Sequence, residues 1–216
     1  MLYLDCDILV VGSLRELWEQ DLEDFYCAAV EEMYEGTTRD ATRLGIQSYF
    51  NAGILLINNK KWVSENISDK LFQATKELYD CNNLIWQDQD VLNYVFKNNI
   101  KWVSPRFNYQ QNCHPNYTYT QYTAEIINNA NLNPIVIHYN TGTKPWNKGY
   151  KCNFKKKEYY SEMRKNKYYF TLFVLFLKQF MRFFFSIRKE NSSNELRKKI
   201  TILGFRYEIS CKNCQN

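Results

Sequence analysis

The sequence lacks a disulfide framework, and its first residues do not resemble a signal peptide. Its seven cysteines are an odd number at irregular spacing, which argues against paired disulfides and favours a reducing compartment. Cys211-x-x-Cys214 has the spacing of a zinc-ligand pair, but there is no second pair of this kind, so a zinc role is disfavoured. We therefore expect a cytoplasmic protein.

Long uncharged runs are scarce in the C-terminal part, and basic residues are scarce in the first half. In the aromatic stretch Tyr168–Arg188, the longest uncharged run has ten residues, about half of what a membrane-spanning helix needs. Residues 1–100 carry 17 acidic and 8 basic side chains, a net charge of −9. Residues 101–216 carry 6 and 20, a net charge of +14. This asymmetry predicts a cation-binding half and a basic tail that meets an anionic partner.

The remaining composition is that of a folded α/β protein. The chain has 216 residues, of which 45% are hydrophobic and 17% aromatic, so it is large enough for one α/β domain and is not disordered. Apolar runs predict strands over residues 2–11, 25–30, 49–57 and 135–139. Because these runs alternate with helical patterns, we expect an α/β sheet with mixed strand directions.

The helical patterns lie between the predicted strands. Ile67, Leu71, Ala74 and Leu78 share the spacing of one helix face, and Asp88–Phe96 predicts a second helix with acids at its N-terminus. The polar segment 31–45 has no periodicity and is interpreted as a loop. The composition becomes basic and aromatic after Tyr150, which predicts two regions, residues 1–150 and 151–216.

An acidic pair, Asp5 and Asp7, interrupts the first apolar run. An unpaired buried carboxylate is costly, so such residues need a purpose inside a strand. Two residues apart on one strand, the two side chains would point to the same side and form a site for Mg²⁺ or Mn²⁺. The alternative is a turn after a short strand, with both acids solvated.

Four local patterns follow one another along the chain. They are Asp5-x-Asp7, Phe50-Asn51-Ala52-Gly53, Trp86-Gln87-Asp88-Gln89-Asp90 and the string from His138 to Trp146. Together they resemble glycosyltransferase family 8, whose members are retaining enzymes that move a hexose from a nucleotide sugar; many bacterial members build lipopolysaccharide. The resemblance covers residues 1–150. It implies a nucleotide-diphospho-sugar transferase of the GT-A type, with a Rossmann-like mixed sheet.

The resemblance assigns Asp5, Asp7 and His138 to the metal, and Gly142 and Lys144 to the donor diphosphate. The residue types agree with these roles, because two carboxylates and one imidazole suit Mn²⁺, with Mg²⁺ as the alternative. A glycine lets the backbone approach a diphosphate closely, and a lysine places a point charge on it. The alternative for His138 is a structural histidine.

The two middle patterns are implied to bind the donor sugar. The resemblance gives Asn51, Ala52, Gly53 and Asp88 contacts with the substrate, and it makes Asp88 and Gln89 catalytic, with Gln89 near the reacting carbon. The alternatives are a bulge at Gly53 and helix capping by Asp88 and Gln89. Because a glutamine is a poor nucleophile, we favour attack from the face of the leaving group. Glu31 departs from the family pattern, since many members carry an aspartate after the second strand.

Three functions compete at this stage. The first is a metal-dependent hexosyltransferase that moves galactose or glucose from a UDP-sugar to lipopolysaccharide or another glycan. The second is a non-catalytic remnant, because only Met1–Leu4 precede Asp5, whereas family members carry further strands there; the resemblance thus implies an N-terminally truncated catalytic domain. The third is a metal enzyme acting on phosphate esters, which leaves the string His138–Trp146 unexplained. Nucleic acid is not an expected partner, because the basic charge lies in an apolar segment.

The tail predicts a membrane-associated helix. On a helical projection of residues 168–189, the polar positions form a narrow stripe consisting of Thr171, Lys178, Arg182, Ser186 and Lys189. Such a helix fits the interface of an anionic membrane, with basic side chains reaching lipid phosphates. We therefore expect a helical tail on the inner face of the cell membrane. The alternative is a helix packed on the catalytic domain.

Overall fold

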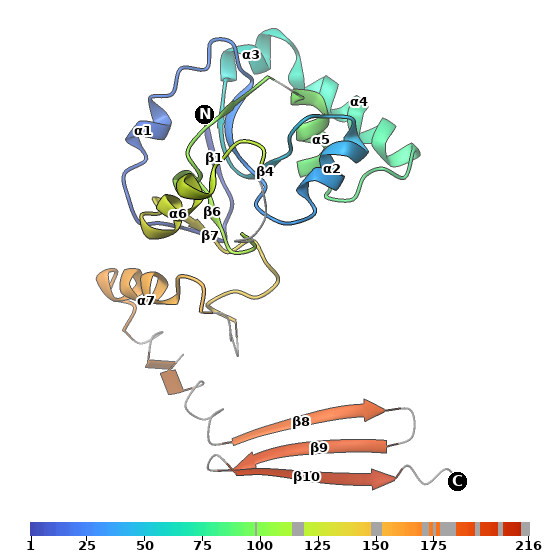
Figure 1. Cartoon of the computed structure of the whole chain (residues 1–216), viewed down its shortest axis with the longest axis vertical. Helices are drawn as coiled ribbons and strands as arrows, with labels where there is room; N and C mark the ends of the chain where they lie inside the picture. Colours follow the sequence, from blue (N-terminus) through green and yellow to red (C-terminus); the bar gives the residue numbers. More distant parts are fainter. Residues whose placement is uncertain are drawn as a thin grey trace. The chain divides into compact units, whose positions relative to one another are not determined.

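The computed structural model of the chain falls into two compact units, Met1–Gly142 and Thr143–Asn216 (Figure 1). The residues that it describes are 1–97, 99–113, 119–147, 153–169, 173–174, 176–177, 185–192, 195–202 and 205–212. The first unit contains two small sheets with helices around them. The second contains a helix and a separate sheet.

The larger sheet of the first unit has the strand order β1-β4-β3-β5. Its strands are β1 (Leu2–Leu4), β3 (Cys27–Glu31), β4 (Phe50–Ile57) and β5 (Ile100–Trp102). β4 runs antiparallel to β1 and to β3, whereas β5 runs parallel to β3. Every residue of β3 and β4 is buried. The mixed sheet predicted from the sequence is therefore confirmed.

The first apolar run contributes to two sheets rather than forming one strand. After β1 the chain turns at residues 5–7, and β2 (Ile8–Val10) then joins β7 (Val136–His138) and β6 (Tyr109–Gln110) in the order β2-β7-β6. The prediction of one continuous strand was wrong at Asp5 and Asp7. Aspartate is unfavourable inside strands and common in turns, so the chain bends where the acids stand.

Helices cover the larger sheet. The helices of the first unit are α1 (Arg15–Trp18), α2 (Thr37–Leu44), α3 (Asn59–Ser64), α4 (Ile67–Asp80), α5 (Asp88–Phe96), α6 (Ala124–Leu132) and the 3-10 turn η1 (Pro105–Phe107). The predictions of α4 and α5 are confirmed. The prediction of a loop over residues 31–45 was wrong, because α2 lies within it. Ala41 and Leu44 bury one face of α2, and Gly45 ends it in the left-handed conformation (φ 66°).

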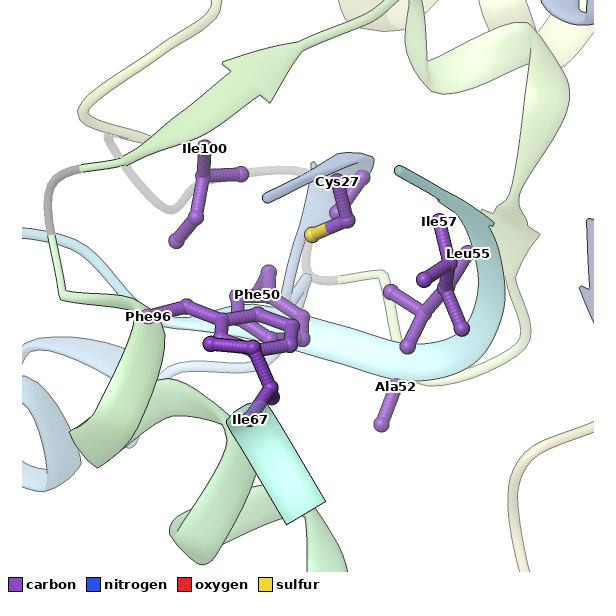
Figure 2. Close-up of a cluster of buried hydrophobic side chains, with 9 residues drawn as sticks. Cys27, Phe50, Ala52, Leu55, Ile57, Ile67, Phe96 and Ile100 are labelled. Atoms are coloured by element: carbon purple, nitrogen blue, oxygen red, sulfur yellow. The ribbon is translucent and has the colours of Figure 1, made fainter. Parts of the chain in front are cut away.

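Two hydrophobic clusters fix α5 against β4. In the first, Phe50 of β4 meets Phe96 of α5 with ring centroids 6.2 Å apart, together with Ile67 of α4 (Figure 2). In the second, side chains of α2, α4 and α5 pack around Tyr49. Figure 1 shows these three helices gathered together on one side of β4. As a result, the N-terminus of α5 lies beside the first half of β4, where the Ala52 N–H donates to Gln89 Oε1.

The second unit corrects the predicted tail. It contains α7 (Lys156–Lys165) and an antiparallel sheet of β8 (Phe185–Ser192), β9 (Glu195–Ile202) and β10 (Phe205–Lys212). The helix predicted over residues 168–189 was wrong in its last part, because 185–189 belong to β8. From Phe185 to Arg188 apolar and polar residues alternate, and this period of two fits a strand.

Other parts of the tail prediction are less fully covered. Thr171, Lys178 and Arg182 lie outside the described residues, as does Cys214 of the zinc-like pair. Residues 173–174 and 176–177 are helical. None of the helices in the described ranges combines the length and the hydrophobicity that a bilayer-spanning helix needs.

Candidate active site

A cavity of about 370 Å³ opens where the two sheets of the first unit meet. Its wall contains the turn after β1, the start of α5 and the residues that follow β3 and β7. Eight of the residues predicted from sequence line it, namely Asp5, Asp7, Asn51, Ala52, Gly53, Asp88, Gln89 and His138. The volume is within the usual range for small-molecule sites. The structure thus brings residues of all four sequence patterns to one place, the fourth pattern through its first residue, His138.

The two aspartates and the histidine form a compact cluster in this cavity. His138 Nε2 lies 3.1 Å from Asp7 Oδ1 and 3.8 Å from Asp5 Oδ2. One ligand atom from each residue lies within 4.8 Å of the other two. Strand pairing explains the convergence, because Ile8 of β2 lies opposite His138 of β7, and the Asp5 N–H donates to the Gly53 carbonyl at 2.8 Å. The turn between β1 and β2, and not a single strand, therefore brings Asp5 and Asp7 together.

The cluster fits a divalent cation. His138 is buried, whereas Asp5 and Asp7 are half-buried and face the cavity. Two carboxylate oxygens and one imidazole nitrogen form a donor set that Mn²⁺ accepts readily and that Mg²⁺ accepts through its oxygens. Asp5 Oδ1 also accepts a hydrogen bond of 2.7 Å from the Tyr3 hydroxyl, which raises the pKa of Tyr3 to about 12. Asp5 is thus held in place from both sides.

Gly53 is required by the crowding around this cluster. A Cβ atom at position 53 would lie 2.2 Å from His138 Cε1 and 2.9 Å from Asp5 Oδ2. Only a residue without a side chain lets the ring and the carboxylate approach β4 this closely. The close approach expected at Gly53 is therefore to His138 and Asp5 of the same chain. The alternative was a bulge at Gly53, but the register between β3 and β4 shifts at Ala28 and Val30 of β3.

The sugar-side residues are linked by hydrogen bonds. Gln89 Oε1 accepts from the Ala52 N–H at 2.9 Å, and Gln89 Nε2 donates to Glu32 Oε2 at 3.0 Å. Asn51 Nδ2 donates to the same oxygen of Glu32 at 2.8 Å. Asp88 is exposed at the first position of α5. These hydrogen bonds hold the amides of Gln89 and Asn51 and the carboxylate of Glu32 in fixed orientations.

Sequence reasoning missed Glu32. It singled out Glu31, but the Glu31 carboxylate is fully buried and accepts hydrogen bonds from Thr120 and from the Gln121 N–H. Glu32 is the acid that lines the cavity. Successive side chains of a strand point to opposite sides, so two adjacent acids at a strand end signal that one faces each way. Which of them faces the site depends on where β3 ends.

Two predicted residues, Gly142 and Lys144, are not among the residues that line the cavity in the first unit. Gly142 ends the first unit in open space, where a Cβ atom would meet nothing within 4 Å. Lys144 belongs to the second unit, in which its carbonyl accepts a hydrogen bond from the Asn147 N–H. Their contacts with a diphosphate stay predictions.

The cavity, its acidic cluster and its amide-lined wall agree with one known family. The family model described as "Glycosyl transferase family 8" matches residues 1–149. The chain belongs to this family. The resemblance inferred from the four sequence patterns is therefore confirmed over nearly all of the first predicted region.

Similar curated proteins include a lipopolysaccharide galactosyltransferase and another bacterial glycosyltransferase. The chain is 35% identical over 152 residues to the lipopolysaccharide 1,3-galactosyltransferase of Salmonella typhimurium, covering 68% of this chain and 44% of that protein. It is 36% identical over 149 residues to the glycosyltransferase GlyE of Streptococcus pneumoniae, covering 68% and 33%. The chain thus spans less than half the length of these two proteins.

A solved family relative confirms the fold class. The galactosyltransferase LgtC, in complex with donor and acceptor sugar analogues, superposes with a TM-score of 0.61 at 31% sequence identity. The match covers 76% of this chain and 60% of LgtC. The chain therefore has the GT-A type of mixed α/β fold that the sequence predicted.

Proposed function

We propose that the cavity binds a UDP-hexose, with galactose or glucose as the sugar, and that the enzyme transfers this hexose with retention to lipopolysaccharide or another glycan. The observation that carries the proposal is that one cavity joins the cluster of Asp5, Asp7 and His138 to the amide-rich wall around Asn51 and Gln89. A cation-binding corner suits the diphosphate, and a wall of hydrogen-bonding groups suits the hexose. The names of two relatives, a lipopolysaccharide galactosyltransferase and a lipopolysaccharide glucosyltransferase, support the proposed hexoses and the proposed acceptor.

Each part of the cavity has a role in this proposal. Asp5, Asp7 and His138 hold Mn²⁺ or Mg²⁺, which when bound neutralises charge on the leaving diphosphate and orients it. Gly142 and Lys144 are predicted to contact that diphosphate. Asn51, Ala52 and Gly53, with Asp88, are predicted to contact the hexose.

The Ala52 N–H and Glu32 fix the orientation of the Gln89 amide. In this proposal, Gln89 lies near the reacting carbon. An amide is a poor nucleophile, so we favour attack from the face of the leaving group, in which an oxygen of the departing diphosphate takes the proton of the acceptor hydroxyl. In this arrangement Gln89 orients the donor and forms no covalent bond.

The test measures release of UDP from UDP-galactose and from UDP-glucose, with Mn²⁺, with Mg²⁺ and with a chelator. We expect release that depends on the metal and on one of the two donors. Donor binding in calorimetry without any release would instead favour the non-catalytic remnant. Binding of neither donor in the presence of Mn²⁺ would contradict the proposed function.

Replacing Asp88 with asparagine is expected to lower kcat about 100-fold while changing the donor KM only slightly. Its predicted contact is to the hexose, where charge develops in the transition state, and loss of one such contact costs about 10²–10³ in rate. Steady-state UDP release measures both constants. Asp69→Asn is the matched control, because Asp69 is also an exposed acid in the first turn of a helix. An unchanged kcat in Asp88→Asn would reduce Asp88 to a helix-capping role.

We further propose two separate regions with different roles, a catalytic region 1–150 and a basic region 151–216. The basic region attaches the enzyme to the anionic inner face of the cell membrane. The support is its excess of basic residues, including the exposed residues Arg164, Lys165 and Lys167 around the end of α7. Each basic residue near such a surface contributes about 1 kcal/mol of attraction.

Changing Arg164, Lys165 and Lys167 together to glutamate is expected to weaken binding to anionic vesicles by at least about 100-fold at low salt. Co-sedimentation with phosphatidylserine vesicles at low and high salt measures the effect. The control changes Lys60, Lys76 and Lys97 to glutamate, which alters the net charge equally on exposed residues of the first unit. Wild-type protein that stays in the supernatant would show that the tail does not bind membranes.

A further inference from the structure

Asn108 is a fully buried polar residue that belongs to none of the sequence patterns. It follows η1 and precedes β6. Its side chain bridges two residues of the candidate active site, since Asn108 Nδ2 lies 2.8 Å from Asn51 Oδ1 and Asn108 Oδ1 lies 2.9 Å from His138 Nδ1. The direction of each hydrogen bond decides what Asn108 does to the histidine.

The orientation of the neighbouring Asn51 amide is fixed from two sides. Its Oδ1 accepts from the Gly53 N–H at 3.0 Å, and a backbone N–H can only donate. Its Nδ2 donates to Glu32 Oε2 at 2.8 Å, and an ionised carboxylate can only accept. Asn51 Oδ1 therefore needs a donor from Asn108, and Asn108 Nδ2 is that donor.

The same logic fixes the tautomer of His138. With Nδ2 of Asn108 turned to Asn51, its carbonyl oxygen Oδ1 faces His138 Nδ1 and accepts the proton of that nitrogen. The neutral imidazole then has its lone pair on Nε2. This lone pair points to the carboxylates, with Asp7 Oδ1 at 3.1 Å, so three acceptors face one space.

We propose that Asn108 is a positioning residue that holds His138 in the Nδ1–H tautomer and aims the Nε2 lone pair into the cation site. This inference rests on the cation site of the proposed function. It adds that one hydrogen-bond chain, from Glu32 through Asn51 and Asn108 to His138, joins the sugar side of the cavity to the cation side. Partners of this kind set ring orientation, and losing one weakens metal binding about 10–100-fold.

The first measurement reads the tautomer in the metal-free protein. Long-range ¹H–¹⁵N correlation spectra, recorded at a pH where the ring is neutral, should show the proton of His138 on Nδ1. The chain has only one other histidine, His114, so a His114→Gln variant assigns the signals. A wild-type spectrum with the proton on Nε2 would overturn the proposal and needs no folded Asn108 variant.

The second measurement is Mn²⁺ affinity, determined by calorimetry or by electron paramagnetic resonance with the metal alone. Asn108→Leu should bind Mn²⁺ about 10–100-fold more weakly and should show a mixture of tautomers. Asn108→Asp keeps an acceptor for His138 Nδ1 and should recover most of the affinity. Asn58→Leu is the control, because Asn58 is also a hydrogen-bonded asparagine, which caps α3 and contacts the Leu22 and Phe25 carbonyls instead of the site.

The two readouts separate this inference from the proposed function. If the wild type binds no Mn²⁺ but carries the proton on Nδ1, the cation site and the proposed function fail, while the hydrogen-bond direction stands. If the wild type binds Mn²⁺ and Asn108→Leu binds it equally well, the positioning role is wrong and the proposed function is untouched.

Discussion

Replacing Gly53 with alanine is expected to lower the affinity for Mn²⁺ about 100-fold and to reduce donor turnover in parallel. The new Cβ would lie 2.2 Å from His138 Cε1, and the ring has little room to move because Asn108 holds Nδ1 and Asp7 faces Nε2. Asp5 Oδ2, at 2.9 Å, would be displaced as well. Misplacing groups of an active site by about 1 Å can lower the reaction rate about 10²-fold. Calorimetry with Mn²⁺ and UDP release measure the two effects.

A second glycine, at which a Cβ atom would make only ordinary contacts, provides a matched control. Gly12→Ala adds the same methyl group where the closest atoms, those of Ile135, lie 3.4 Å away, an ordinary contact. Overpacking at position 53 should also cost about 1–3 kcal/mol of stability, so thermal unfolding is followed in both variants. If Gly53→Ala remains folded and binds Mn²⁺ like the wild type, Asp5, Asp7 and His138 do not form one cation site.

The sequence predicted which residues would meet in the cavity better than it predicted how they meet. Asp5 and Asp7 were expected to share a side of one strand, but a turn between β1 and β2 brings them together. The composition of a motif reflects the chemistry of the site, whereas its local geometry depends on which sheet each flank joins. Pairing of Ile8 with His138, 130 residues later in the chain, is invisible to local pattern reading.

The same reason explains why Glu32 and Asn108 were missed. Neither stands in a local pattern, and their roles come from contacts with Asn51, Gln89 and His138, which lie at distant positions in the sequence. Glu32 could have been suspected as one of two adjacent acids at a strand end. Asn108 offered no comparable signal, because asparagine after a proline-containing turn is common.

The errors in secondary structure have a different origin. In α2 the apolar residues are few, so burial of its short face by α4 and α5 decides the helix, and tertiary packing outweighs weak periodicity. In the sequence, the spacing of the polar residues Arg182, Ser186 and Lys189 fits a helix, but the alternation from Phe185 to Arg188 fits a strand equally well. Pairing with β9 along its whole length favours the strand.

A buried ion pair fixes the loop that presents Asp88 and Gln89. Asp90 is fully buried, and its Oδ1 lies 2.7 Å from Arg43 Nη2 and from the Tyr49 hydroxyl. Its Oδ2 accepts from the N–H groups of Ile85 and Trp86, both at 2.7 Å. The next residue, Gln87, has a φ of 50°, a conformation that non-glycine residues rarely adopt. The loop keeps this conformation because Gln87 is held at both ends. Before it, the Asp90 carboxylate accepts from the Ile85 and Trp86 N–H groups, and after it α5 begins at Asp88.

Burial alone would raise the pKa of Asp90, but the hydrogen bonds and charge of Arg43, together with the Trp86 N–H and the Tyr49 hydroxyl, lower it. A depressed pKa means that the carboxylate stabilises the fold above its unfolded-state pKa of about 3.9, and that this contribution is lost as the pH falls through the lower folded-state value.

Replacing Asp90 with asparagine is therefore expected to lower the free energy of unfolding at neutral pH by about 3–5 kcal/mol. It removes the carboxylate that lies 2.7 Å from Arg43, leaves Arg43 with Asp40 at 3.3 Å as its remaining ion-pair partner, and places an amide donor among donors. The variant should also lose less stability than the wild type between pH 5 and the acid transition, since the titrating group is gone. Urea unfolding at several pH values measures both effects.

Asp80→Asn, at an exposed position near the end of α4, is the control and should change stability by no more than about 0.5 kcal/mol. A wild-type stability in Asp90→Asn would mean that the ion pair does not hold the loop. If Asp90→Asn stays folded but no longer releases UDP, the ion pair is needed to place Asp88 and Gln89 and not to keep the domain folded.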